Sequence, residues 1–89
     1  MDIQKIGIVG AGQMGNGIAH VMALAGYDVL LNDVSADALA KAMKTVTGNM
    51  DRQVSREKIT AAERDAAMAR ITTTQTLSDL GQSDLVIEA

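Results

Sequence analysis

The first third of the chain alternates between short apolar runs and a helical repeat. One apolar run predicts a strand at Lys5–Val9, and another predicts a strand at Asp28–Asn32. Between these runs, apolar residues recur at helical spacing, so we expect a helix over Gly12–Ala25 with Gly26 as the capping residue after it. The side chains expected to face the sheet are Ile18, Met22 and Ala25.

The middle of the chain carries a longer helical pattern. Ser35 is the expected N-cap of a helix over Ala36–Val54, because its hydroxyl can accept a backbone N–H at the helix start. At about 100° of turn per residue, the apolar side chains of this helix form one narrow stripe. The members of the stripe are Leu39, Met43, Val46, Met50 and Val54.

The last third predicts shorter elements. Thr60 and Glu63 form a T-x-x-E capping box, which begins a helix over Ala61–Ala69. A polar strand at Ile71–Thr73 follows, and its polarity suits a position near the edge of a sheet. The final expected elements are a helical turn at Leu77–Leu80 that ends at Gly81 and a buried strand at Asp84–Ala89.

Strands that alternate with helices in this way predict an α/β fold with a parallel sheet. Right-handed crossovers place the second strand beside the first and the third beyond the second. The fourth strand is expected on the other side of the first, which gives the order 3-2-1-4 of a Rossmann-type sheet. Because the chain ends with this strand, we expect residues 1–89 to be the N-terminal part of a dinucleotide-binding domain, truncated after the fourth strand.

A G-x-G-x-x-G motif joins the first strand to the first helix. Gly10 permits a sharp turn, Gly12 permits a ligand to approach the backbone, and Gly15 permits close packing of helix on strand. The first N–H groups of the helix lack partners within it, and the helix dipole adds positive charge, so this turn is predicted to bind a pyrophosphate. Ala89 is expected beside Gly10, where both would meet the cofactor.

Asp33 follows the second strand, at the position of the ribose-binding acid of this motif. A carboxylate there can accept the ribose hydroxyls of the adenosine and would repel a 2′-phosphate, which predicts NAD rather than NADP. His20 lies within the first helix, and no nucleophile or paired acid has a matching position. We therefore interpret His20 as an ordinary helical residue and expect no catalytic residue in this chain.

Composition narrows the classes of function. The 89 residues include no cysteine, which excludes disulfides and thiolate metal sites, and no metal site is expected. The net charge of −3 argues against nucleic acid as the main partner. The start of the chain lacks the pattern of a signal peptide, and no apolar run is long enough to span a bilayer. We expect a soluble, cytoplasmic protein.

One stretch of the chain departs from this acidic balance. Between Lys41 and Lys58 there are five basic residues, namely the two ends with Lys44, Arg52 and Arg56, and two acidic ones. Gly48 lies on the polar side of this helix, although glycine costs up to about 1 kcal/mol there. The pattern fits either a solvated helix surface or a site for an anionic part of a substrate.

The glycine-rich turn and the start of the helix read G-A-G-Q-M-G-N-G-I-A at Gly10–Ala19. This run resembles the 3-hydroxyacyl-CoA dehydrogenase family, which typically has G-x-G-x-M-G-x-G-I-A there, and within it the bacterial 3-hydroxybutyryl-CoA dehydrogenases. The resemblance continues through NMDRQVSREKIT at Asn49–Thr60, ARITTT at Ala69–Thr74 and DLVIEA at Asp84–Ala89. It covers essentially the whole chain.

The resemblance implies an oxidoreductase that moves hydride between NAD and the C3 carbon of a 3-hydroxyacyl-CoA or 3-oxoacyl-CoA, of the 3-hydroxybutyryl-CoA and acetoacetyl-CoA type, in fatty acid metabolism. The family's catalytic residues and its helical substrate and dimerisation domain lie beyond residue 89, so a homodimer is implied only for the full-length protein. The implied NAD-binding residues are Gly10, Ala11, Gly12, Gln13, Met14, Gly15 and Asp33. The implied CoA-binding positions are Asn49, Arg52, Arg56 and Lys58.

Two alternatives stay open. A stand-alone NAD-binding regulatory module would need no CoA-binding surface, and a dehydrogenase of a non-CoA 3-hydroxy acid would not need Arg52 and Arg56. The role of Glu88, structural or in ordering the loop near the nicotinamide, also stays open.

Overall fold

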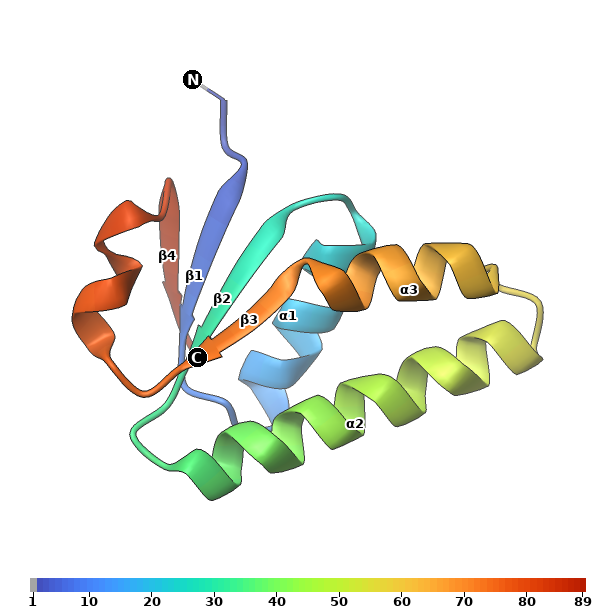
Figure 1. Ribbon diagram of the computed structural model, residues 1–89, viewed down its shortest axis with the longest axis horizontal. Helices are drawn as coiled ribbons and strands as arrows, with labels where there is room; N and C mark the ends of the chain where they lie inside the picture. Colours follow the sequence, from blue (N-terminus) through green and yellow to red (C-terminus); the bar gives the residue numbers. More distant parts are fainter. Residues whose placement is uncertain (1) are drawn as a thin grey trace.

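The structure, a computed structural model, describes residues 2–89. These residues form a parallel sheet of four strands in the order β3-β2-β1-β4, with helices packed against it (Figure 1). This confirms the predicted α/β fold and strand order. The strands are β1 (Lys5–Val9), β2 (Asp28–Asn32), β3 (Ile71–Thr74) and β4 (Leu85–Glu88).

The two central strands have the bounds that the hydrophobic pattern predicts. β1 pairs with β2 from Lys5 opposite Asp28 to Val9 opposite Asn32. Ile6 and Ile8 are buried on the same face of β1, because alternate side chains of a strand point to the same side. They form the core together with small and aliphatic side chains of the helices.

Helix α1 (Gln13–Leu24) packs on this face through small residues. Gly15, Ala19 and Ala23, four residues apart, are its buried positions. The prediction of which α1 side chains face the sheet was wrong in part. Ala25 is exposed and is the C-cap of the helix, and Ile18 and Met22 are only partly buried at the margin of the core. Small side chains face the sheet because they let the helix axis approach it closely.

The end of α1 is a Schellman motif, as the position of Gly26 predicts. Gly26 has a φ of 104°, which favours glycine. Its N–H donates to the carbonyl of Ala23 at 3.1 Å, and the N–H of Tyr27 donates to the carbonyl of Met22 at 3.1 Å. The chain can therefore reverse from α1 directly into β2.

Helix α2 (Ala36–Ser55) begins at Ser35, whose hydroxyl accepts the N–H of Ala38 at 3.1 Å. The cap is confirmed, and the helix ends one residue later than expected. Its buried positions are Leu39, Ala42, Val46 and Met50. Met43 and Val54, which the predicted stripe also contained, are only half-buried.

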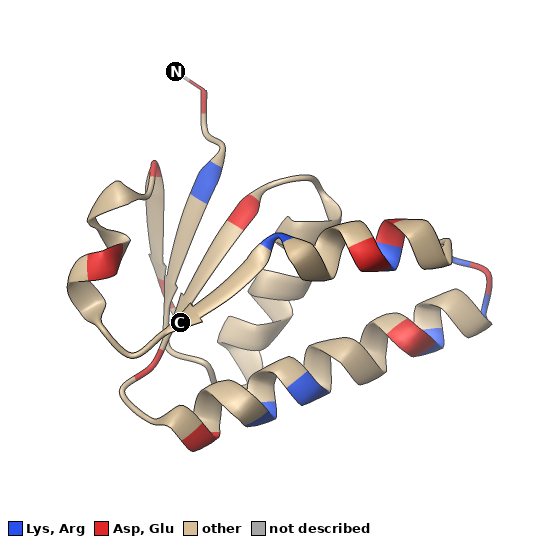
Figure 2. Cartoon of the chain, in the orientation of Figure 1, with Lys and Arg blue, Asp and Glu red and all other residues tan. Residues whose placement is uncertain are grey.

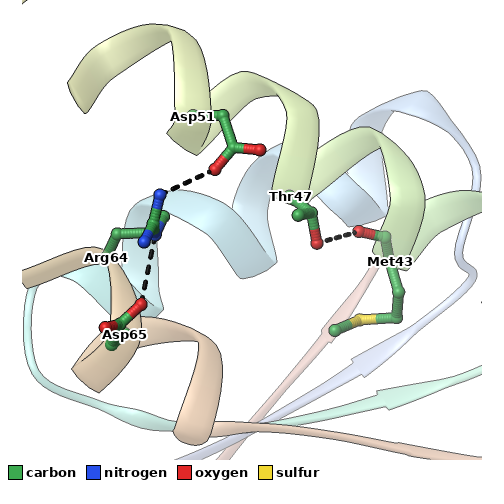
Figure 3. Close-up of polar contacts among 5 residues, drawn as sticks. All are labelled: Met43, Thr47, Asp51, Arg64 and Asp65. Carbon is green, nitrogen blue, oxygen red and sulfur yellow. Dashed lines mark hydrogen bonds and ion pairs between the residues drawn. The ribbon is translucent and has the colours of Figure 1, made fainter. Parts of the chain in front are cut away.

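Helix α3 (Ala61–Ala69) has the predicted bounds and capping box. Thr60 accepts the N–H of Glu63 at 3.0 Å, and Glu63 accepts the N–H of Thr60 at 2.9 Å. An ion pair of 3.0 Å joins Arg64 of α3 to Asp51 of α2 (Figure 3). The two helices therefore lie side by side.

Two expectations about the C-terminal end were wrong. The 3-10 helix η1 (Leu77–Gln82) continues through Gly81, which does not terminate it. The fourth strand was expected to be buried, but Leu85 and Val86 are 42% and 48% exposed. Among residues 2–89, β4 is at the edge of the sheet and pairs only with β1. The burial of its side chains therefore depends on which segments pack against it, and the apolar pattern of the strand does not specify those segments.

Candidate functional site

The carboxyl ends of β1, β2 and β4 converge at one edge of the sheet. Gly10, directly after β1, has a φ of 102° and donates its N–H to the carbonyl of Asn32 at 2.8 Å. The N–H of Ala89 donates to the carbonyl of Val9 at 2.9 Å. A β-carbon on Gly10 would lie 2.9 Å from the carbonyl oxygen of Ala89. Gly10 and Ala89 therefore lie side by side, as predicted.

The glycine-rich turn is tight on its inner side and open on its outer side. A β-carbon on Gly15 would lie 1.7 Å from the carbonyl oxygen of Gly10, so only glycine fits between α1 and the turn. At Gly12, by contrast, no atom lies within 4 Å of the position that a β-carbon would take. Gly12 is the N-cap of α1 and has no side chain to occupy the helix N-terminus. A ligand can therefore reach the free backbone N–H groups there.

Two further predicted cofactor contacts follow Gly12. Gln13 and Met14 begin α1, and both side chains are exposed at the same helix N-terminus. Ala11 precedes them and is buried at 3% exposure, so its side chain does not face a ligand at this helix N-terminus.

Asp33 connects the end of β2 to the glycine-rich turn. Its Oδ2 accepts the N–H of Ala11 at 3.0 Å, and its Oδ1 accepts the N–H of Ser35 at 2.9 Å. These two hydrogen bonds lower the pKa of the Asp33 carboxyl below its usual value, and the bond from the N–H of Ala11 has the larger effect. The carboxylate is therefore ionised at neutral pH, and its remaining lone pairs are available to ribose hydroxyls.

The arrangement has the parts that a dinucleotide needs. The helix N-terminus at Gly12 offers N–H donors to a diphosphate, and the ionised Asp33 offers acceptors to a ribose next to it. Glu88 lies at the end of β4, opposite Val9, with an exposed side chain. Its exposure excludes a role as a core residue within the described chain.

The predicted CoA-binding positions lie at the C-terminal end of α2, away from the glycine-rich turn. A guanidinium nitrogen of Arg52 donates to Oδ1 of Asn49. A β-carbon on Gly48 would lie 3.9 Å from Nη1 of Arg52, which is an ordinary contact distance. Arg56 is the C-cap of α2, and Lys58 follows in the turn before α3. Arg52, Arg56 and Lys58 are all exposed. Figure 2 shows Lys and Arg positions spaced along α2 and the turn after it.

His20 takes part in a contact between helices. Its Nε2 lies 2.6 Å from Oε1 of Gln53, which ties α1 to the C-terminal half of α2. This geometry agrees with the interpretation of His20 as a structural residue.

A groove separates α1 from the first half of α2. The side chains and backbone of Gly12, Gln13 and Asn16 line one wall, and those of Lys41, Ala42 and Thr45 line the other. Asn16 was not among the predicted site residues. Its spacing of three residues from Gln13 on α1 could have indicated a shared face, but the groove depends on how two helices pack and cannot be read from either helix alone.

Two classes of feature are absent from the described part of the chain. Residues 2–89 contain no group of three or more His, Asp or Glu side chains placed to hold a metal ion. No helix in the same range is long and apolar enough to cross a membrane.

Comparison with known proteins identifies the family to which this nucleotide-binding domain belongs. Residues 5–89 match the family described as 3-hydroxyacyl-CoA dehydrogenase, NAD binding domain. The chain belongs to this family. The family resemblance and the choice of NAD as cofactor are thereby confirmed, while the roles of the individual site residues stay predictions.

The relatives of the chain agree with this assignment. A 3-hydroxybutyryl-CoA dehydrogenase of Bradyrhizobium diazoefficiens is 57% identical over 86 residues, which cover 97% of this chain and 29% of that protein. One from Mycobacterium tuberculosis is 42% identical over 98% of this chain and 30% of its own length. The chain therefore spans about 30% of the length of these curated relatives.

Solved structures share the fold closely. The (S)-3-hydroxybutyryl-CoA dehydrogenase of Ralstonia eutropha superposes with a TM-score of 0.96 at 44% identity, over 99% of this chain and 31% of that one. A lactate dehydrogenase of Cryptosporidium parvum, at 22% identity and a TM-score of 0.64, shares the fold alone. The fold of the sheet and its helices is thus common to dehydrogenases that are named for different substrates.

Proposed function

We propose that residues 1–89 are the N-terminal part of the NAD-binding domain of a dehydrogenase that transfers hydride between NAD and C3 of a 3-hydroxyacyl-CoA. The proposed substrate pair is 3-hydroxybutyryl-CoA and acetoacetyl-CoA. The observation that carries the cofactor part of the proposal is the contact between Asp33 and the N–H of Ala11, beside the open N-terminus of α1. The names of the relatives support the substrate class.

In this proposal the chain binds the cofactor and part of the substrate, and catalytic groups come from a later part of the protein. Asp33 holds the adenosine ribose, and the turn from Gly10 to Gly15 holds the pyrophosphate. Arg52 and Arg56, exposed on α2, bind phosphates of CoA with Asn49 and Lys58 beside them. A second domain, a homodimer and a cytoplasmic location belong to the same proposal.

The test uses the full-length protein that carries this chain. NADH oxidation is measured with acetoacetyl-CoA, with free acetoacetate, and with NADPH in place of NADH. Hydride from NADH to the C3 carbonyl, with a proton to its oxygen, gives 3-hydroxybutyryl-CoA and NAD⁺. Turnover with NADH and the thioester, and much weaker turnover in the other arms, is expected.

The other outcomes separate the alternatives. Equal turnover with free acetoacetate would keep a dehydrogenase but remove CoA recognition. Tight NAD binding without turnover on any substrate would favour a regulatory module.

A further inference from the structure

The loop that carries Asp33 is held from β3 as well as from the glycine-rich turn. β2 and β3 pair in register up to Asn32 opposite Thr74, and the loops after both strands leave the same end of the sheet (Figure 1). The carbonyl of Thr74 accepts the side-chain amide of Asn32 at 3.1 Å and the backbone N–H of Asp33 at 3.2 Å. The side-chain amide of Gln75 donates to the carbonyl of Val34 at 3.1 Å. Hydrogen bonds of the residue before Asp33 and of the residue after it therefore join its loop to the end of β3.

The two side-chain bonds differ in their surroundings. Asn32 is polar but only 3% exposed, and its own backbone carbonyl accepts the N–H of Gly10 at 2.8 Å. A buried amide is costly unless it is hydrogen-bonded, so the bond from Asn32 to Thr74 keeps the ends of β2 and β3 together. Gln75 is exposed, and packing of the core does not account for its contact with Val34.

The turn after β3 is itself braced. The hydroxyl of Thr74 accepts the N–H of Thr76 at 3.0 Å and donates to Oδ2 of Asp79 at 2.5 Å. These bonds fix the turn that holds the Asp33 loop. The loop therefore lies between two supports, the braced turn after β3 on one side and the glycine-rich turn on the other.

We propose that Asn32 and Gln75 are positioning residues for the Asp33 carboxylate, and that they set the affinity for NAD and the choice of NAD over NADP through Asp33. The inference rests on the proposed role of Asp33 as the acceptor for the adenosine ribose. Without these two side-chain bonds the loop also occupies other positions, and the apparent affinity falls with the fraction of molecules that keep the binding position. A displaced carboxylate also repels a 2′-phosphate less, so the preference for NAD narrows.

The experiment compares Gln75→Leu and Asn32→Leu with the matched control Gln82→Leu in the full-length protein. Gln82 is also exposed, but it lies at the end of η1, beside Lys5 and Asp28 at the amino ends of the strands. In fluorescence titrations each positioning variant should bind NADH about twofold to tenfold more weakly, the effect of one lost hydrogen bond, and Gln82→Leu should bind it as tightly as the unmodified protein. The affinity of the positioning variants for NADPH should fall less than their affinity for NADH.

A double-mutant cycle with Asp33→Asn separates positioning from a general loss of stability. Residues that act in one network have non-additive effects, so Gln75→Leu and Asn32→Leu should weaken NADH binding little further in the Asp33→Asn background. Urea unfolding is measured beside the titrations. Asn32→Leu is expected to lower the free energy of unfolding because Asn32 is buried, whereas Gln75→Leu, at an exposed position, is expected to change it little.

The outcomes distinguish this inference from the proposed function. If Asp33→Asn weakens NADH binding but a variant of Asn32 or Gln75 binds NADH as tightly as Gln82→Leu, that side chain does not position Asp33. An equal loss of NADH affinity with and without Asp33→Asn would show that the side chain acts independently of Asp33, and would overturn the inference. If Asp33→Asn itself leaves the affinity for NADH unchanged, the proposed role of Asp33 fails instead.

Discussion

Gly15 faces Gly10 so closely that a β-carbon on residue 15 would lie 1.7 Å from the carbonyl oxygen of residue 10. This contact connects the first turn of α1 to the end of β1, and no side chain can be accommodated without moving one of them. The same helix contains Gly17, where a β-carbon would meet no atom within 4 Å. The two glycines therefore offer a matched pair of substitutions.

We expect Gly15→Ala to lower the free energy of unfolding by about 1–3 kcal/mol, because it forces α1 away from the turn. Gly17→Ala should be neutral or stabilising by up to about 1 kcal/mol, since alanine favours a helix more than glycine does. Urea unfolding of both variants measures the difference, and NAD titration should show weaker binding only for Gly15→Ala. Equal stability of the two variants would contradict the close packing.

Asp33→Asn should weaken NAD binding by roughly tenfold or more, because a charged acceptor for the ribose hydroxyls is lost. The substitution also removes the repulsion of a 2′-phosphate, so the preference for NADH over NADPH should narrow. Fluorescence titration with each cofactor measures both effects. Asp37→Asn, in the exposed first turn of α2, is the control and should leave both affinities nearly unchanged.

Replacing Arg52 and Arg56 together with Glu should raise the KM for acetoacetyl-CoA by about tenfold or more in the full-length protein, through loss of charge-assisted bonds and repulsion of phosphate. The affinity for NAD should change little, because these side chains are at the far end of α2 from the glycine-rich turn. Steady-state kinetics with acetoacetyl-CoA and with acetoacetyl-pantetheine measures the effect. A KM equal to that of the unmodified protein would remove CoA binding from this surface.

Asp84 makes the start of β1 sensitive to acid. Its Oδ2 accepts the N–H groups of Gln4 and Lys5, each at 2.9 Å, and these bonds lower the pKa of the Asp84 carboxyl. A lowered folded-state pKa stabilises the fold above the ordinary pKa of Asp, about 3.9, and this contribution is lost as pH falls through the lower folded value. Asp84→Asn should therefore be less stable than the unmodified protein at pH 6, and the difference should shrink below about pH 4.

Urea unfolding of both proteins between pH 3 and pH 7 tests this expectation. A constant difference in the free energy of unfolding over that range would show that Asp84 does not titrate against the backbone of β1.

Local signals in the sequence were enough to predict most of the fold. The bounds of β1 and β2 follow from their apolar runs, and the starts of α2 and α3 follow from Ser35 and the Thr60–Glu63 box, whose partners are only a few residues away. The strand order follows from the handedness of the crossovers. Each of these features depends on residues that are close together in the sequence or on a rule common to all parallel sheets.

The features that were not predicted depend on contacts between distant segments. Hydrophobic periodicity selected the larger side chains of α1, whereas Gly15, Ala19 and Ala23 face the sheet because close approach favours small residues. The exposure of Leu85 depends on what lies beside β4 rather than on the strand's own pattern. The groove at Asn16 and Thr45 requires α1 and α2 to be placed side by side, which neither helix specifies alone.

The two backbone bonds of Asp33 have a consequence for recognition. The N–H groups of Ala11 and Ser35 hold each carboxylate oxygen before any ligand arrives. In the proposed binding mode the ribose would meet an acceptor that is already preorganised, and binding would not need to restrict the rotation of the Asp33 side chain. Any shift of the glycine-rich turn would move Ala11 and reorient the Asp33 carboxylate at the same time, so the proposed contacts with the phosphate and with the sugar would change together.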